Sequence, residues 1–183
     1  MNEVYNRIKE ICLNTNDNDP IRIARKIMHD DLIKMHGPEH HFIDGASLLC
    51  AIYNVKKDFD LEMALNNLAL RSEKMPGAIC GYWGICGAVA SVSSAMSVLH
   101  HTTPLTSDDY YKDHMELSSL ILKKMSEIGG PRCCKRNAFL SLSYAVEFVE
   151  KKYGIKMDLD NISCEFSPWN KQCIGNKCPF YRN

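Results

Sequence analysis

The sequence lacks a net charge and lacks any long apolar run. Lys and Arg together number 22, as do Asp and Glu, so the formal net charge is zero. A chain balanced in this way has no general attraction for nucleic acid or for an anionic membrane surface. No segment approaches the roughly 18 apolar residues that would cross a bilayer, and the start, Met-Asn-Glu-Val-Tyr-Asn-Arg, lacks the apolar core of a signal peptide. We therefore expect a cytoplasmic protein without a membrane partner and without clear nucleic-acid binding.

The sequence also lacks the alternating pattern of β-strands, internal repeats and any linker between domains. Apolar residues recur instead at helical spacing, and Asp19-Pro20 is a typical helix start. We predict one all-α domain over residues 1–183, a bundle of about seven helices with an irregular cysteine-rich tail, 155–183, folded back on it. The predicted helices are 2–14, 20–35, 43–55, 61–74, 85–100, 107–127 and 133–153, with 85–100 as the central one.

Cysteine is the residue type that stands out. The chain has nine, about 5% of its residues, which is below the roughly 8–10% of small disulfide-bonded scaffolds. Because the number is odd, at least one cysteine has no partner within the chain. In a reducing cytoplasm, such cysteines bind metal or do chemistry more often than they form structural disulfides.

Two of these cysteines lie in a glycine-rich stretch over 76–91, which begins as a loop and ends as a helix. Cys80 and Cys86 are spaced among glycines at 77, 81, 84 and 87, which allow close approach of the backbone. The helix is expected to begin near Cys86, where free N–H groups and the helix dipole favour a thiolate. We interpret the two cysteines as catalytic or reactive thiols. The alternative is that both are neutral packing residues.

The tail has the spacing C-x8-C-x4-C, formed by Cys164, Cys173 and Cys178. Ordering a tail without helical or strand periodicity costs roughly 1–2 kcal/mol per residue, and metal ligation can supply that free energy. We predict that these three cysteines are metal ligands. The alternative is a tail held by its aromatic residues alone, Phe166, Trp169 and Phe180.

Three cysteines are one short of the usual four ligands. The fourth is expected from Cys133 or Cys134, in the segment Arg-Cys-Cys-Lys-Arg. Neighbouring residues at the start of a helix point about 100° apart, so one of the two could bind the metal while the other faces Cys80 or Cys86. Three cations, Arg132, Lys135 and Arg136, are expected to stabilise thiolates or an anionic cluster nearby. Alternatively these charges belong to a solvated helix end.

A further candidate group is His36-Gly-Pro-Glu39-His40-His41, at the mouth of a predicted helix. Its imidazoles and carboxylate could ligate metal or move protons, and we assign Glu39 and His40 as candidate acid–base groups. A surface loop with hydrogen-bonded histidines is the alternative. Cys12 and Cys50 lie on apolar helix faces and are predicted to be core residues.

The glycine-rich stretch, the paired cysteines and the tail resemble an uncharacterised cysteine-rich family of anaerobic bacteria and archaea. The resemblance covers residues 29–181, including His36 to His41. In that family the domain occurs alone or beside a methyltransferase domain, which implies a possible methyltransferase partner. The resemblance implies no activity.

Three functions remain open. The first is an iron–sulfur protein, with a cluster of the 4Fe-4S type, that does redox or sulfur-transfer chemistry with a small molecule or a protein redox partner. Ligation by only three cysteines would leave one iron open to a substrate sulfur. The second is a structural zinc module for interactions. The third is a metal-free thiol redox protein using Cys80 and Cys86, although the common redox spacing is C-x-x-C.

Overall fold

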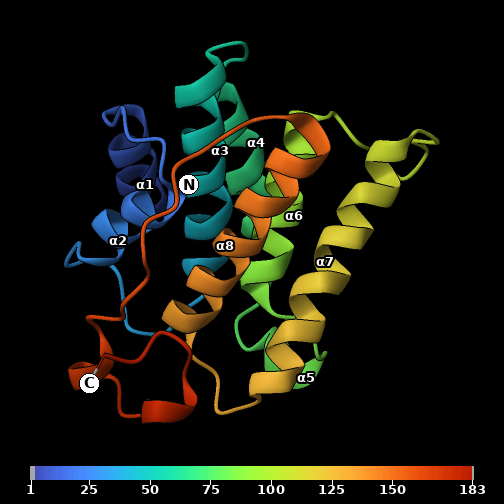
Figure 1. The fold of residues 1–183 in the computed structure, drawn as a ribbon. Coiled ribbons are helices and arrows are strands. Elements are labelled where there is room, and N and C mark those ends of the chain that lie inside the picture. Colours follow the sequence, from blue (N-terminus) through green and yellow to red (C-terminus); the bar gives the residue numbers. More distant parts are fainter. Residues whose placement is uncertain (1–2, 183) are drawn as a thin grey trace.

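A computed structural model describes residues 3–182 and is drawn in Figure 1. Within these residues the chain forms eight α-helices and two short 3-10 helices, and it has no β-strand. The prediction of an all-α fold is therefore confirmed. The elements are α1 (Glu3–Leu13), α2 (Pro20–Met28), α3 (His40–Lys56), α4 (Leu61–Ser72), α5 (Ile79–Tyr82), α6 (Gly87–Leu99), α7 (Asp109–Ile128), α8 (Cys134–Tyr153), η1 (Ser167–Trp169) and η2 (Gly175–Lys177).

The centre of the bundle is α3, in which every residue from His40 to Ile52 is buried. It packs most extensively against α6. Gly45 of α3 lets the two backbones approach closely. A Cβ atom at Gly45 would lie 2.5 Å from the carbonyl oxygen of Ser91, and the Gly45 N–H donates to the Ser91 hydroxyl at 2.8 Å. We expected the helix over 85–100 to be central. That expectation was wrong, since α3 is the central helix. Its two buried histidines and its buried aspartate make its sequence look less apolar than the sequence of a core helix usually does.

Most helix boundaries lie close to those predicted, with two exceptions. Helix α2 ends at Met28, well before the predicted end at Met35. The cause is Asp30, whose carboxylate accepts from the Leu32 N–H at 3.1 Å and from the Arg7 guanidinium at 2.7 Å, which turns the chain. The short helix α5 lies inside the glycine-rich stretch and was not predicted.

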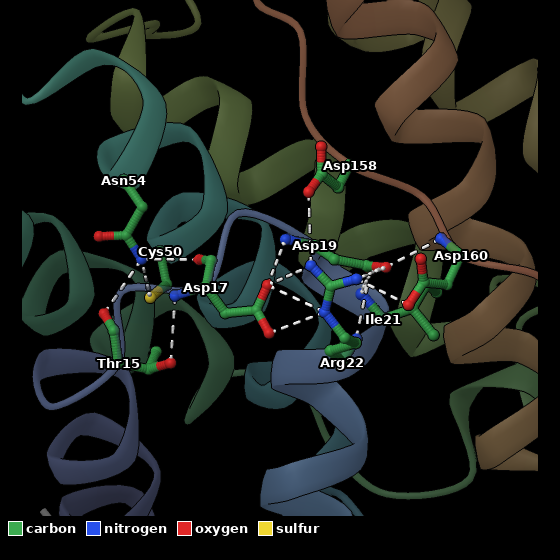
Figure 2. A network of polar contacts seen from close by, with 9 residues as sticks. All are labelled: Thr15, Asp17, Asp19, Ile21, Arg22, Cys50, Asn54, Asp158 and Asp160. Atoms are coloured by element: carbon green, nitrogen blue, oxygen red, sulfur yellow. Dashed lines mark hydrogen bonds and ion pairs between the residues drawn. The ribbon is translucent and has the colours of Figure 1, made fainter.

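Figure 2 shows the polar contacts that fasten the tail to the start of α2. Asp19 caps this helix by accepting from the Ile21 N–H at 2.7 Å, and its second oxygen accepts from the Asp160 N–H at 2.9 Å. Arg22 donates to the Asp160 carboxylate at 2.6 Å and also contacts Asp17. One buried carboxylate therefore holds both the helix start and the beginning of the tail.

From there the tail runs down beside α2 and ends below the start of α8 (Figure 1). Its two arms are joined by a hydrogen bond of 2.7 Å from the Cys164 N–H to the Phe180 carbonyl. Arg25 of α2 donates to the Ser163 carbonyl at 2.7 Å, and the Phe166 ring is buried in the core. These contacts bring the cysteines of the tail next to the first residues of α8.

None of the helices within residues 3–182 is both long enough and apolar enough to span a lipid bilayer.

Candidate functional site

Four cysteines from separate parts of the chain line one small cavity, which we call the tail pocket. Cys164, Cys173 and Cys178 come from the tail, and Cys133 comes from the residue before α8. The cavity measures about 20 Å³. Its other walls are mainly aromatic and aliphatic, with two cations: Phe166, Ile174, Phe180, Tyr181, Lys135 and Arg136.

Cys133 is the N-cap of α8, a helix of 20 residues. Its sulfur accepts from the Arg136 N–H at 3.4 Å and from the side-chain amide of Asn170 at 3.4 Å. Two N–H donors and the positive end of a long helix therefore surround this sulfur. Burial raises the pKa of the Cys178 thiol, whereas nearby Arg136 acts in the opposite direction.

Lys135 is only 1% exposed, so it does not belong to a solvated helix end. Its ammonium group lies 3.2 Å from the Lys34 carbonyl, 3.3 Å from His40 Nε2 and 5.0 Å from the centre of the Phe166 ring. Burial lowers its pKa to about 8. Its side chain therefore brings a buried positive charge to the wall of the tail pocket, beside the four thiols.

Arg136 is also buried, but its guanidinium already has partners. It donates to the carbonyls of Gly129 and Pro131, at 3.0 Å each. It therefore holds the loop before α8 and adds positive charge to the wall of the tail pocket.

A second and larger cavity lies on the other side of Cys133, and we call it the thiol cavity. It measures about 250 Å³ and contains three thiols. Cys80 comes from α5, Cys86 is the N-cap of α6, and Cys134 is the first residue of α8. The remaining polar side chains of its lining are His36, His40, His41, Arg132 and Asn137.

The consecutive residues Cys133 and Cys134 therefore serve different cavities, and a hydrogen-bonded bridge joins the two sites. The Cys134 N–H donates to His36 Nδ1 at 3.3 Å, and His36 Nε2 donates to the Asn170 side-chain oxygen at 3.0 Å. Asn170 in turn donates to the Cys133 sulfur. With both ring nitrogens bonded in this way, His36 is neutral, and burial accordingly lowers its pKa.

Burial favours the protonated form of two thiols of the thiol cavity, Cys86 and Cys134. Burial raises the pKa of Cys134 to about 12. Burial also raises the pKa of Cys86, although the N–H groups at the start of α6 and the Asn137 amide, 3.2 Å from its sulfur, lower it. We expected the helix start to make Cys86 a thiolate. The dipole acts in the expected direction, but desolvation is the larger effect.

The two candidate acid–base residues, Glu39 and His40, lie in different surroundings. Glu39 is not among the residues lining either cavity, and its carboxylate instead accepts from the Lys34 N–H at 3.1 Å. His40 is 2% exposed and lies on the wall of the thiol cavity. Burial and the neighbouring Lys135 charge lower its pKa well below the usual value, so His40 is neutral.

Comparison with protein families shows which family the chain belongs to. A family model described as "Family of unknown function" matches residues 8–181, nearly the whole length. The chain belongs to the DUF5714 family. No curated protein and no solved structure matches it.

Two residues of this DUF5714 site were not identified as site residues from sequence. Asn137 contacts the Cys86 sulfur, and Asn170 contacts the Cys133 sulfur. Only Asn137 had a usable signal, because it lies three residues after Cys134 and so on the same helix face. The core position predicted for Cys12 and Cys50 is confirmed, since both are fully buried.

Gly87 explains how His41 reaches the cavity wall of this DUF5714 chain. A Cβ atom at this position would overlap the His41 imidazole ring. The ring therefore packs directly on the backbone at the start of α6, and only glycine leaves that space.

Within residues 3–182, no three His, Cys, Asp or Glu side chains stand close enough to bind a single metal ion. A cluster places each thiolate on a different iron, so its ligands stand further apart than those of one ion.

Proposed function

We propose that this protein is an iron–sulfur protein in which Cys133, Cys164, Cys173 and Cys178 hold a cluster of the 4Fe-4S type. The observation that supports this proposal is that four thiols, from the tail and from the start of α8, line one small cavity. Four cysteines and no competing carboxylate or imidazole form the usual ligand set of such clusters. When bound, a cluster of this kind supplies electrons one at a time.

The surroundings of the four thiols support an anionic group. Lys135 and Arg136 bring two positive charges to the pocket wall, and both are buried. Asn170 and the Arg136 N–H donate to the Cys133 sulfur. Hydrogen bonds to a ligating sulfur tune the reduction potential of a cluster, so the role of Asn170 in this proposal is to raise that potential.

The thiol cavity is then the place where redox or sulfur-transfer chemistry occurs. It is larger than the tail pocket, it contains three further thiols, and Cys134 is joined to the ligand Cys133 by one peptide bond. Electrons would have only a short path between the two sites. In this proposal Cys80 and Cys86 contact the substrate, and Arg132 is a binding residue.

A structural zinc site is the second candidate, because one observation favours it. The free volume of about 20 Å³ holds about one water-sized sphere, which suits a single ion better than a cluster. A zinc protein would draw the same four thiols, which within residues 3–182 stand too far apart for one ion, together into a closed site, and the protein would serve as an interaction module.

The test is anaerobic purification followed by an absorption spectrum and by iron, sulfide and zinc analysis. We expect iron and acid-labile sulfide in equal amounts, with a broad visible absorption that bleaches on reduction. The variants Cys173→Ser and Cys178→Ser should lose them. Cys80→Ser changes a thiol that does not line the tail pocket and is the matched control. Stoichiometric zinc without sulfide would replace the first proposal with the second, and metal-free protein would refute both.

We also infer the setting of this activity from the same chemistry. An oxygen-sensitive cluster with free thiols beside it suits an anaerobe and a reducing cytoplasm. The partners would be a small-molecule substrate or a protein redox partner, and a methyltransferase partner follows from the family resemblance alone.

A further inference from the structure

Three helices begin at the thiol cavity. The first residues of α3, α6 and α8 all line it: His40 and His41, Gly87 and Ala88, and Cys134. The helices have 17, 13 and 20 residues, so each has a developed dipole with its positive end at this place. Helix N-termini are favourable positions for anions, and here three of them converge.

The thiol cavity has no negative charge of its own. No aspartate or glutamate is among its lining residues. Arg132 lies on its wall, and within residues 3–182 its guanidinium has no hydrogen bond or ion pair. Arg132 is the one arginine or lysine among these lining residues. A guanidinium without a protein partner at the mouth of a cavity is suited to an anionic ligand.

A buried polar atom on the wall also lacks a partner. His40 Nε2 lies 3.3 Å from both the Lys135 ammonium group and the Lys34 carbonyl oxygen. The second ring nitrogen, Nδ1, is buried and has no hydrogen-bond partner within residues 3–182. Leaving a buried polar group unpaired costs roughly 1–3 kcal/mol, and a polar ligand group that reached it would remove that cost.

The cavity is also rich in sulfur, which is a chemically soft, polarizable atom. Three thiol groups approach one space, and Cys86 is held in place by the Asn137 amide. Polarizable sulfur atoms prefer a polarizable partner to an oxygen. The volume of about 250 Å³ is below the range of pockets for drug-sized ligands, so the ligand is small.

We propose that the thiol cavity binds a small anion that carries a soft sulfur atom, such as a sulfur oxyanion or a mercaptocarboxylate. Arg132 and the three helix N-termini hold its charge, and the thiols of Cys80, Cys86 and Cys134 contact its sulfur. This inference rests on the proposed function, since it names the substrate class for the same cavity.

The experiment is calorimetric titration of the anaerobically purified full chain, with its metal content measured on the same sample. The first probe pair is thiosulfate against sulfate, which differ by one terminal sulfur at equal charge. The second pair is 3-mercaptopropionate against butyrate, in which a methyl group replaces the thiol. The two pairs distinguish an inorganic ligand from an organic one.

We expect the sulfur-bearing member of at least one pair to bind more tightly. Arg132→Gln should weaken its binding about tenfold, the value of one charge-assisted hydrogen bond. Lys123→Gln removes one exposed positive charge from α7, outside the cavity, and should leave binding unchanged. Because sulfate is also more strongly hydrated than thiosulfate, the decisive measurement is the ratio of the two affinities. In Cys86→Ser that ratio should fall severalfold.

Equal binding of the two members of both pairs, or no detectable binding, would overturn the inference. So would equal effects of Arg132→Gln and Lys123→Gln, or an affinity ratio unchanged in Cys86→Ser. Circular dichroism of each variant separates loss of binding from loss of fold. Anion binding by metal-free protein would refute the cluster and keep this inference, whereas a loaded cluster without anion binding would do the reverse.

Discussion

The tail pocket and the thiol cavity differ in nearly every property, although one peptide bond, between Cys133 and Cys134, joins them. The tail pocket has four thiols, little free space and two buried cations. The thiol cavity has more space, an exposed arginine, and thiols whose protonated form is favoured by burial. The first is suited to holding a group permanently, and the second to exchanging a ligand.

The comparison shows that the hydrogen-bond donors around a thiol are not determined by its place in a helix. Cys86 and Cys133 are both N-caps of helices. The Cys133 sulfur accepts from a backbone N–H and from Asn170, whereas the Cys86 sulfur has one amide donor and a raised pKa. The same helix position therefore places the two sulfurs in different surroundings.

The largest effect should come from removing one ligand of the tail pocket. Cys178→Ser should abolish metal binding and lower the free energy of unfolding by more than about 3 kcal/mol, because ligation free energy is also folding free energy. Metal analysis and denaturant unfolding under anaerobic conditions measure both. Cys86→Ser is the comparison in the thiol cavity and should keep the metal. Equal metal loss in the two variants would mean that the sites are one.

A smaller effect is expected from closing the space under His41. Gly87→Ala places a methyl group against the imidazole, and overpacking of this kind costs about 1–3 kcal/mol. The free energy of unfolding should fall by that amount while the metal content stays unchanged. At Gly81 a Cβ atom would meet nothing within 4 Å, so Gly81→Ala is the matched control. Loss of metal in Gly87→Ala would contradict the separation of the two regions.

The stability of the protein in acid depends in part on His100, which lines neither the tail pocket nor the thiol cavity. This effect should be measured separately from any release of metal in acid. His100 stacks on Tyr110 at 3.9 Å, and burial with the neighbouring His114 lowers its pKa to about 4. A lowered pKa means that the unfolded chain binds the proton first. The contribution of neutral His100 to the free energy of unfolding is therefore complete above pH 6.5 and is lost as the pH falls towards 4.

The variant His100→Phe keeps the stack but has no proton to bind. Between pH 6.5 and 4 the wild type should lose about 1–2 kcal/mol more stability than this variant, allowing for partial exposure of the ring. Unfolding curves at a series of pH values measure the difference. His101→Asn, at an exposed neighbouring position, should follow the wild type. Parallel pH profiles for wild type and His100→Phe would contradict the assignment.

The smallest effect concerns the donor to Cys86. Asn137→Ala removes the amide that lies 3.2 Å from its sulfur, and a hydrogen bond of this kind contributes about 0.5–1.5 kcal/mol. Because the amide lowers the pKa of Cys86, its loss should raise that pKa further and slow alkylation at any given pH. Peptide mapping after timed alkylation follows Cys86 alone. Faster alkylation would show that Asn137 shields the thiol instead of activating it.

Much of the fold could be predicted because its signals are local. Asp19-Pro20 starts α2, Gly154 ends α8 in a left-handed conformation, and apolar spacing identifies the faces between them. The prediction was wrong where a tertiary contact decided the outcome. The Arg7–Asp30 ion pair helps end α2 early, and the close approach at Gly45 makes α3 the central helix.

The site was predictable in its parts but not in its arrangement. The cysteine spacing of the tail predicts a group of thiols, and the angle between consecutive helical residues separates Cys133 from Cys134. The bridge from His36 to Asn170 joins residues far apart in sequence and has no local signal. For the same reason, the meeting of three helix N-termini at one cavity could not be foreseen.

The position of the tail pocket also sets an order of events during synthesis. Its only thiol before the tail, Cys133, stands at the start of the last long helix, and the other three follow residue 163. A ribosome makes the chain from the amino end, so all eight α-helices of residues 3–182 are synthesised before any of those three thiols exists. Under the proposed function the ligand set is complete only once Cys178 has been added, and a chain cut short before it would carry the helices yet lack one ligand.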